Sequence, residues 1–355
     1  DAVLAVGDRP TVLAARAAER LGLRGNPPDA AAATANKREA RRRFTALGLQ
    51  APWHFAIPLD TDPGSLVSDP RLRFPCVVKP LGLSGSRGVI RADSATECES
   101  AFRRIQSLLE RPDVREARTG LEDTVLVEGF IPGREWAMEA VLTAGALQVF
   151  ALFEKPDPLD GPFFEETVYV TPPRRLDRTI ERLFTSAVEQ AVRALGLTHG
   201  PIHAEFRYGD AGVFVLEIAS RPIGGLCSRV LRFVNGSSAE RISLEEVLLR
   251  HALGEDVTAY RRESQPAAVM MIPIPKRGLF KRVDGEAAAR AVRHVEDVRI
   301  TAKLDQLLEP LPEAGSYLGF IFARAATPDA ADRAVREAHR ELTFTVEPRI
   351  DLVPG

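Results

Sequence analysis

The stretch HAEFRYGDAGVFVLEIASRPIGG, residues 203–225, predicts a β-hairpin. Polar and apolar side chains alternate along its first arm, and its second arm is rich in the β-branched and aromatic residues that favour strands. Residues 210–212, DAG, suit a three-residue loop with the glycine in the left-handed conformation. In that register Glu205 lies directly opposite Glu217, so the hairpin brings two carboxylates close together.

Two carboxylates at this separation repel each other unless a cation lies between them. Mg²⁺ prefers one or two carboxylates together with the phosphates of a substrate. Arg221 shares the face of Glu217, and Gly224 and Gly225 follow it. The hairpin therefore suggests a metal clamp beside a fixed cation, although a hairpin with a solvated polar face has the same pattern.

Composition and charge exclude several classes of protein. The 355 residues are 45% hydrophobic and 27% charged, which fits two or three globular domains. A net charge of −2 gives no basic footprint for nucleic acid, and no apolar run reaches the roughly 18 residues of a membrane span. The first residues resemble a strand and turn rather than a signal peptide, and the lack of an initiator Met indicates missing N-terminal residues.

The cysteines indicate the cellular compartment, and the basic residues indicate candidate site residues. Three cysteines without paired spacing indicate neither a zinc site nor disulfides, and they fit a reduced, cytoplasmic protein. The basic run 37–43 is interpreted mainly as the solvated face of a helix. Only six of the 47 basic residues are lysines, which makes each lysine a candidate point charge. These are Lys37, Lys79, Lys155, Lys276, Lys281 and Lys303.

The first part of the chain has the pattern of an α/β unit followed by strands. Residues 3–6, VLAV, are predicted as a strand, with helices over 12–21 and 37–47. Residues 52–69 are interpreted as a proline-containing connection. The strands PCVVKP and GVIRA then enclose a Gly-Ser loop, and a capping box at 94–97 opens a helix.

Strands and helices alternate irregularly in the rest of the chain. The strands LVEGF, EWAMEAVL and ALQVFALFEK precede a long helix predicted over 176–195. The hairpin comes next, and an amphipathic helix is expected near 244–252. From residue 266 the pattern is strand, helix, strand, strand, helix, strand, with YLGFIFARA and ELTFTVE as the clearest strands. This predicts a compact α+β tail.

Lys79 ends the strand PCVVKP, and the loop SGSRG follows at residues 84–88. Backbone N–H groups and hydroxyls in such a loop can enclose phosphates, and the lysine supplies the compensating charge. The spacing matches neither GxxxxGK[ST] nor GxGxxG, so neither a P-loop nor a dinucleotide-binding fold is favoured. An ordinary hairpin turn also fits this segment.

Four segments together resemble one family. KREARRRFTALGLQAP, FPCVVKPLGLSGSRGV, VEGFIPGREW and HAEF…LEIASRPIGG occur in the order and spacing of ATP-grasp carboxylate-amine ligases. The resemblance covers essentially the whole chain, which is most similar to the L-amino-acid ligases that synthesise dipeptides.

The resemblance implies an α/β and α+β multidomain ATP-grasp fold. Residues 1–50 would be the remainder of an N-terminal pre-ATP-grasp domain, and 51–135 the small lid lobe. Residues 136–262 would form the large catalytic lobe, and 263–355 a C-terminal α+β subdomain packed on it.

The resemblance also implies roles for individual residues. Lys37 and Lys79 would contact the phosphates of ATP, and Ser84, Gly85, Ser86 and Gly88 would form the phosphate lid. The adenine would be lined by Glu128, Phe130 and Ile131, and the ribose would be bound by Glu135. One or two Mg²⁺ ions, with Mn²⁺ as an alternative, would be held by Glu205 and Glu217. The substrates would meet Glu166, Tyr169, Arg221, Gly224 and Gly225. The catalytic groups would be Arg221, Lys155 and His203.

Some of these assignments stay open. Ala219 stands where many ATP-grasp ligases have a metal-binding asparagine, which leaves a second Mg²⁺ undecided. Tyr169 stands where relatives often have histidine. His203 is either a hydrogen-bonded neighbour of Glu205 or a catalytic group. Lys155 either reaches the γ-phosphate of ATP or pairs with Glu154 or Asp157.

The resemblance implies an enzyme that forms an amide or peptide bond through an acyl-phosphate and releases ADP and phosphate. The substrates would be amino acids, or an amino acid and a related small acid. A ligase for a nucleotide precursor or a peptide acceptor remains an alternative, as does a non-catalytic ATP-binding module. We expect small-molecule carboxylate and amine partners, no nucleic acid and no membrane, and leave a homodimer open.

Overall fold

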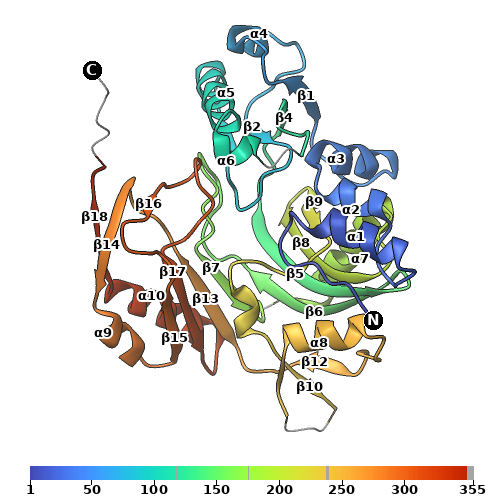
Figure 1. The fold of residues 1–355 in the computed structure, drawn as a ribbon, viewed down its shortest axis with the longest axis vertical. Coiled ribbons are helices and arrows are strands. Elements are labelled where there is room, and N and C mark those ends of the chain that lie inside the picture. Colours follow the sequence, from blue (N-terminus) through green and yellow to red (C-terminus); the bar gives the residue numbers. More distant parts are fainter. Residues whose placement is uncertain (117–118, 175, 237–239, 350–355) are drawn as a thin grey trace.

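The computed structural model describes residues 1–116, 119–174, 176–236 and 240–349 (Figure 1). Its centre is an eight-stranded sheet whose neighbouring strands are all antiparallel. In spatial order the strands are β15 (Val295–Ile300), β17 (Gly319–Arg324), β13 (Ala267–Ile272), β7 (Val168–Thr171), β6 (Ala146–Glu154), β5 (Arg134–Thr143), β8 (Gly200–Gly209) and β9 (Gly212–Ala219).

The middle strands of this sheet have two different faces because successive side chains alternate. Trp136 and Met138 of β5 pack with Phe184 of α7 (Arg178–Leu195) in one buried core. Ala137 and Val141 of the same strand belong to a second core on the opposite face. Glu135 and Glu139 of β5 share the parity of Ala137, as do their β8 partners Arg207 and His203, so these residues lie on the second face.

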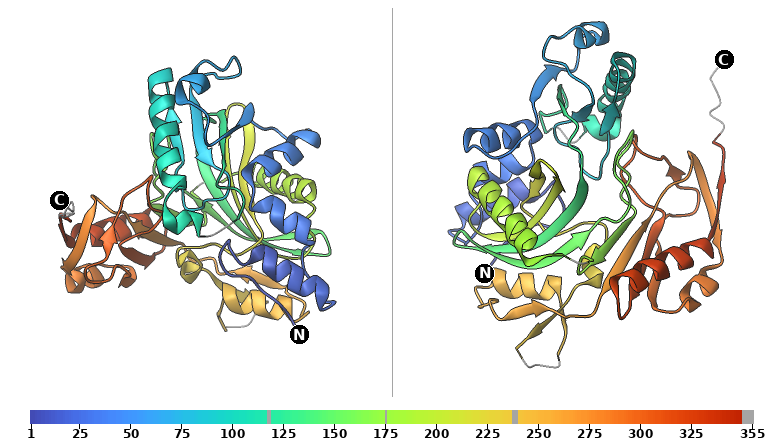
Figure 2. Two further views of the ribbon diagram at one scale, coloured as in Figure 1. Left: turned by 45° about the horizontal axis from the view of Figure 1, so that its top comes forward. Right: turned by 180° about the vertical axis from the view of Figure 1, so that it is seen from behind.

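The helices cover the two ends of the sheet (Figures 1 and 2). The helix α7 lies beside β8 and β9, together with α1 (Thr11–Arg20), α2 (Pro28–Thr34) and α3 (Lys37–Ala46). At the other end, α9 (Glu286–Ala291) and α10 (Pro328–Arg340) pack against β13, β15 and β17.

A separate four-stranded sheet forms what we call the lid lobe. Its order is β1 (His54–Pro58), β4 (Thr124–Gly129), β2 (Cys76–Pro80) and β3 (Ile90–Ala92). The helix α5 (Ala95–Leu109) buries its apolar stripe on this sheet, and α4 (Pro63–Val67) and α6 (Pro112–Arg115) lie beside it. Half of the predicted capping box is present at the start of α5: Ser94 Oγ accepts a hydrogen bond from Glu97 N at 3.3 Å, while the Glu97 carboxylate accepts from Asp93 N at 2.7 Å rather than from Ser94 N.

Two small sheets complete the fold. One contains β11 (Ile242–Ser243), β10 (Arg232–Asn235) and β12 (Tyr260–Arg262), next to α8 (Leu244–Ala252) and the short 3₁₀ helix η1 (Cys227–Val230). The other contains β16 (Leu307–Leu308), β14 (Gly278–Asp284) and β18 (Thr343–Glu347). No helix in the described parts of the chain has the length and apolar character needed to cross a membrane.

The sequence-based elements are largely confirmed, with corrections near the N-terminus. Residues 3–6 are not a strand, because no described strand pairs with them. The helix α2 was not predicted, although its alanine run and the proline at its start favour a helix. The connection predicted at 52–69 contains β1 and α4 instead, and β1 is a strand because it pairs with β4.

The tail also contains more than was predicted. The strands YLGFIFARA and ELTFTVE are confirmed as β17 and β18. The predicted order lacked β14 and β16, which pair with each other in the small sheet containing β18. The strand β13 pairs with β7, so the tail continues the central sheet rather than only packing on it.

The hairpin has the predicted pairing but a different loop. Gly209 pairs with Gly212, which leaves a two-residue turn rather than three loop residues. A β-bulge between the Glu205 and Phe206 positions adds the missing residue, because Phe206 pairs with Val215. Glu205 therefore still pairs with Glu217.

Candidate functional site

A cavity of about 890 Å³ lies between the lid lobe, the central sheet and the C-terminal subdomain, by which we mean residues 263–349. It is lined by every residue predicted for the site except Gly88 and Lys155. Gly88 lies behind the lid loop, where its N–H donates to the Pro312 carbonyl at 2.8 Å. Lys155 is buried in the wall.

Two cross-strand pairs on β5 and β8 lie at the polar floor of this cavity, and all of their residues except Glu139 line it. Glu135 is paired with Arg207, and Arg207 Nε donates to Glu135 Oε2 at 2.9 Å. Glu139 is paired with His203, whose Nδ1 lies 2.5 Å from Glu139 Oε1. Burial would lower the pKa of His203, but Glu139 and Glu205 outweigh it and raise that pKa to about 9. The floor therefore holds its charges in pairs.

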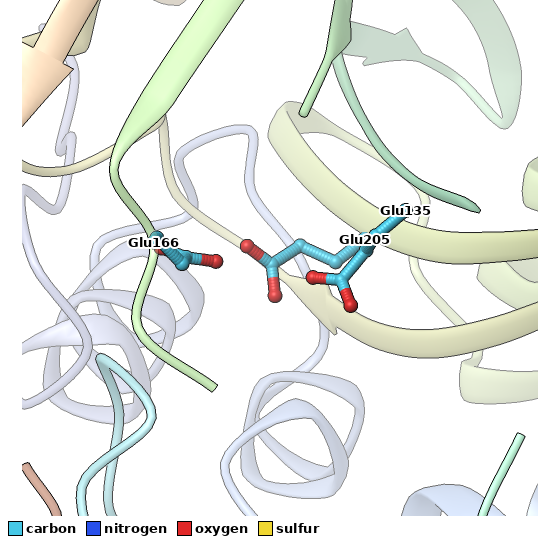
Figure 3. A group of neighbouring side chains, drawn as sticks. All are labelled: Glu135, Glu166 and Glu205. Atoms are coloured by element: carbon cyan, nitrogen blue, oxygen red, sulfur yellow. The ribbon is translucent and has the colours of Figure 1, made fainter. Parts of the chain in front are cut away.

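Lys155 lies at the centre of three carboxylates. Its Nζ is 2.7 Å from Glu135 Oε1, 2.5 Å from Glu166 Oε1 and 3.0 Å from Glu205 Oε1. Figure 3 shows Glu135 and Glu205 on neighbouring strands and Glu166 opposite them, on the segment before β7. The ammonium thus joins segments that are far apart in the sequence.

Burial and the neighbouring charges act in opposite directions on the pKa values of Lys155, Glu205 and Glu166. Burial opposes charge on Lys155, yet the three carboxylates raise its pKa well above the ordinary value. Burial likewise opposes charge on Glu205, but Lys155 and His203 lower its pKa well below the ordinary value. For Glu166 burial dominates, and its pKa rises to about 7. Glu166 therefore titrates near neutral pH.

The expected pairing of Lys155 with Glu154 or Asp157 is not found among the described residues. Glu154 instead pairs with Arg174, with 3.5 Å between Arg174 Nη1 and Glu154 Oε2. Asp157 accepts from Arg336 Nη2 at 2.7 Å. Both acids are already engaged by arginines, whereas the side chain of Lys155 points to the glutamates of the cavity wall.

The geometry distinguishes two candidate metal positions. Oxygens of Glu135, Glu166 and Glu205 lie within 4.8 Å of one another, but the Lys155 ammonium already serves these three. Glu217 is more open: its side chain is 26% exposed, and among the described residues its only ion-pair partner is Lys37, whose Nζ lies 3.7 Å away. Glu217 is paired across the hairpin with Glu205, and both residues line the cavity, so a divalent cation that enters the cavity meets this pair, with Glu205 shared between the ion and Lys155.

Lys79 belongs to a buried group with excess positive charge. Glu128 accepts from Lys79 Nζ and from Arg41 Nε, the latter at 2.8 Å. One carboxylate therefore faces two cations. Burial and the two cations act in opposite directions on Glu128, and its pKa falls to about 2. Burial lowers the pKa of Lys79 to about 8.

An apolar slot adjoins this charged group. The rings of Phe130 and Phe164 are stacked with centroids 6.4 Å apart. The Arg207 guanidinium lies 5.2 Å from the Phe130 centroid and 5.4 Å from that of Phe164. Ile131 and Leu216 also line the cavity. A flat, uncharged ring system fits such a lining.

Arg221 enters the cavity from the end of the hairpin. Its Nε donates to Asp8 Oδ1 at 2.6 Å. Burial opposes the charge, but Asp8 raises the pKa of Arg221. Gly224 and Gly225 follow, and Leu226 has φ +55°, a strained value for a side chain of this kind.

Several functional candidates were missed from the sequence. Glu139 and Arg207 have the parity of Glu205 on β5 and β8, so the alternation contained a signal for them. Arg41 was included in the supposedly solvated run, but it is only 1% exposed. Asp8 lies more than 200 residues from Arg221 in sequence, and no local pattern indicates their contact.

The lid loop 84–88 contacts the C-terminal subdomain directly. Arg87 Nε donates to the Glu313 carbonyl at 2.7 Å, in addition to the bond from Gly88. Behind the loop, Arg104 Nη2 of α5 donates to Glu313 Oε2 at 2.8 Å. Arg111 pairs with Glu309 at 2.7 Å. These contacts hold the loop over the cavity.

Two family models match the chain. A model described as an ATP-grasp domain matches residues 72–230, and one described as L-amino acid ligase C-terminal domain 2 matches 270–347. A crystal structure of an L-amino acid ligase from Bacillus licheniformis matches with a TM-score of 0.81 and 27% identity, covering 98% of this chain and 82% of that one.

Two curated relatives are longer than this chain. An uncharacterised protein of Sinorhizobium fredii is 25% identical over 336 residues, which are 93% of this chain and 65% of that protein. An alanine–anticapsin ligase of Bacillus subtilis is 28% identical over 225 residues, which are 59% of this chain and 46% of that enzyme. The chain thus spans less than two thirds of the length of both relatives.

Glu313→Ala is expected to loosen the lid loop. The change removes the ion pair with Arg104 and keeps the two backbone carbonyls that Arg87 and Gly88 bond. Because an exposed ion pair contributes about 0.2–1 kcal/mol, amide hydrogen exchange in residues 84–88 should become faster by a factor of about 1.4 to 5. Mass spectrometry after exchange measures this rate.

Glu99→Ala is the matched control, since it removes an exposed pair with Arg103 on the same helix at 2.7 Å. It should leave exchange in the lid loop unchanged. Equal exchange in the Glu313 variant and the parent chain would contradict a role for this pair in holding the loop.

Proposed function

The chain belongs to the ATP-grasp superfamily and carries an L-amino acid ligase C-terminal domain, and from this premise we propose that it is an ADP-forming ligase that joins a carboxylate to an amine. One observation carries the proposal: a single cavity contains the excess positive charge at Lys79, the paired acids Glu205 and Glu217, and Arg221. Phosphoryl transfer requires these groups in one place, because its catalysis depends mainly on positioning and charge neutralisation.

In this proposal ATP occupies the part of the cavity next to the lid lobe. Its adenine lies in the slot beside Phe130 and Ile131, close to Glu128. Its ribose faces Glu135. Its phosphates lie near Lys79 and the lid loop, whose Ser84, Gly85 and Ser86 line the cavity. Lys37 lies across from the loop, with its Nζ 2.6 Å from the Leu83 carbonyl.

Glu205 and Glu217 would hold Mg²⁺. The ion would neutralise charge on the phosphate oxygens when bound. Glu217 is suited to this role because it is open to the cavity and has no hydrogen-bond donor in the described chain other than the distant Lys37. Ala219 offers no further ligand atom, so the proposal requires one ion and leaves a second undecided.

The chemistry we propose has two steps. An oxygen of the carboxylate substrate bonds to the γ-phosphorus of ATP, and the bond from that phosphorus to the bridging oxygen of ADP breaks. The amine nitrogen then bonds to the carbonyl carbon of the acyl-phosphate, and phosphate leaves with the oxygen that came from the carboxylate. Arg221 would stabilise the transferred phosphoryl group.

The amine must lose a proton before it can attack. Glu166 suits this task, because a carboxylate with a pKa of about 7 accepts a proton near neutral pH. Tyr169, whose OH donates to Glu205 Oε1 at 3.3 Å, would border the same substrate. Lys155 and His203 would act by holding these acids in place, and the closed lid would exclude water from the acyl-phosphate.

We propose amino acids, or an amino acid and a related small acid, as the substrates. The alanine–anticapsin ligase among the relatives supports this class without naming the pair used here. Cys76, Cys98 and Cys227 are free and buried, which supports a reducing compartment, and we place the reaction in the cytoplasm.

Glu217→Gln tests the metal assignment. The substitution keeps the size of the side chain and removes its charge. The substrates would first be found by screening paired acids and amines. With both substrates present, the rate of ADP release in this variant should fall by a factor of at least about 10². A coupled ADP assay measures the rate, and mass detection of the amide identifies the product.

Glu110→Gln, an exposed substitution at the end of α5, serves as the control and should retain full activity. Undiminished ADP release in the Glu217 variant would show that the metal assignment is wrong. A parent chain that binds ATP but shows no amine-dependent turnover would instead be a binding module.

Lys79 gives a pH dependence for ATP binding. With its pKa lowered to about 8, the lysine is protonated below that pH and loses its charge above it. The dissociation constant for a non-hydrolysable ATP analogue should be constant below about pH 8 and should rise by up to about tenfold per pH unit above it.

Calorimetric titration from about pH 7 to about pH 9.5 measures this dependence. Lys79→Arg is the control, because arginine keeps its proton over this range and should show no step. The same step in the arginine variant, or a flat profile in the parent chain, would contradict the role of Lys79.

A further inference from the structure

The C-terminal subdomain forms its own end of the cavity. Its apolar part surrounds Gly225, where an added Cβ would lie 3.5 Å from Phe320 and 3.6 Å from both Cys227 and Met271. The rings of Tyr317 and Phe320 meet edge to face at 5.9 Å. Its polar part is a short rim made of Thr301, Lys303, Gln306 and Ser316. None of these rim residues has a role in the function proposed above.

Lys303 differs from the other cations that line the cavity. Lys37 and Lys79 face Glu217 and Glu128, while Arg207 and Arg221 face Glu135 and Asp8. In the described ranges no acidic partner is found for Lys303, which is exposed on the rim. Lys303 therefore presents an uncompensated positive charge to the cavity.

The backbone around Lys303 is held in a tight turn. Gln306 N donates to the Lys303 carbonyl at 2.9 Å, and Lys303 N donates to Gln306 Oε1, also at 2.9 Å. Asp305, the acid in the same turn, accepts from Lys281 Nζ at 2.7 Å. The turn is thus anchored on both sides, and its own carboxylate is engaged by a different lysine.

The proposed reaction leaves one carboxylate without a partner. The carboxylate of the acyl donor is consumed, because its oxygen passes to phosphate. If the amine substrate is an amino acid, its own carboxylate stays charged throughout the reaction. A charged group that enters a partly enclosed cavity requires a compensating charge.

We propose that Lys303 binds the carboxylate of the amino-acid acceptor, and that this contact makes the site prefer free amino acids over their amides. This inference rests on the proposed ligase function and deepens it. Lys303 lies on the C-terminal subdomain, and Glu166 lies on the segment before β7. The two residues would hold opposite ends of the acceptor, with its side chain toward Met271, Tyr317 and Phe320.

The test compares acids with their amides as acceptors. The probes are L-alanine and L-alaninamide, and L-phenylalanine and L-phenylalaninamide, each with the acyl donor found by the screen. In Lys303→Gln the KM for the free amino acids should rise about tenfold, because one charge-assisted hydrogen bond is lost. The KM for the amides, the KM for ATP and the kcat should stay within about twofold of the parent values, as expected when only ground-state binding is lost.

Two further variants make the comparison specific. Lys276→Gln removes an exposed lysine of the same subdomain that does not line the cavity, and it should change none of these constants. Lys303→Arg keeps the charge and should restore most of the preference for free acids over amides.

An equal rise in KM for acids and amides would overturn the inference, as would a rise confined to ATP or to the acyl donor. Either result would leave the ligase function intact, because the parent chain would still form the amide. If the parent chain forms no amide with any tested pair, the proposed function fails and the inference fails with it.

Discussion

The site depends on one ammonium group shared by three carboxylates. Lys155 directly follows β6, and its partners Glu135, Glu166 and Glu205 lie on β5, before β7 and on β8. An isolated buried charge costs free energy, so the four segments have to bring the ammonium and the three carboxylates within hydrogen-bond distance of one another. Arg207 offsets the charge of Glu135. The negative charge that remains faces the cavity, where a metal ion and a substrate ammonium would be attracted.

The second constraint is the continuity of the central sheet. Pairing of β13 with β7 makes the C-terminal subdomain an extension of the catalytic sheet. Its loops therefore reach two parts of the site: Lys303 lines the cavity, and Glu313 contacts the lid loop through Arg87. The proposed reaction would gain from this arrangement, because the same subdomain contacts the lid loop and would contact the acceptor when the lid covers the acyl-phosphate.

The sequence predicted local structure well and long-range contacts poorly. The pairing of Glu205 with Glu217 was predicted because alternation and turn residues are local signals, although the real turn is shorter and a bulge restores the register. The partners of Lys155 were not predicted, since the sequence does not specify how strands far apart in the chain are arranged. Arg41 was placed on a solvated helix face for the same reason. Its partner Glu128 is far away in the sequence, so the basic run 37–43 gives no sign of the buried salt bridge between them.

The transfer of oxygen-18 from a labelled carboxylate substrate to the released phosphate tests the central claim most directly. The parent chain would be supplied with ATP, the labelled acid and the amine, and the phosphate would be examined by mass spectrometry. We predict one labelled oxygen in each phosphate, because the carboxylate oxygen bonds to the transferred phosphorus and leaves with it. Amide formed together with unlabelled phosphate would contradict the acyl-phosphate route.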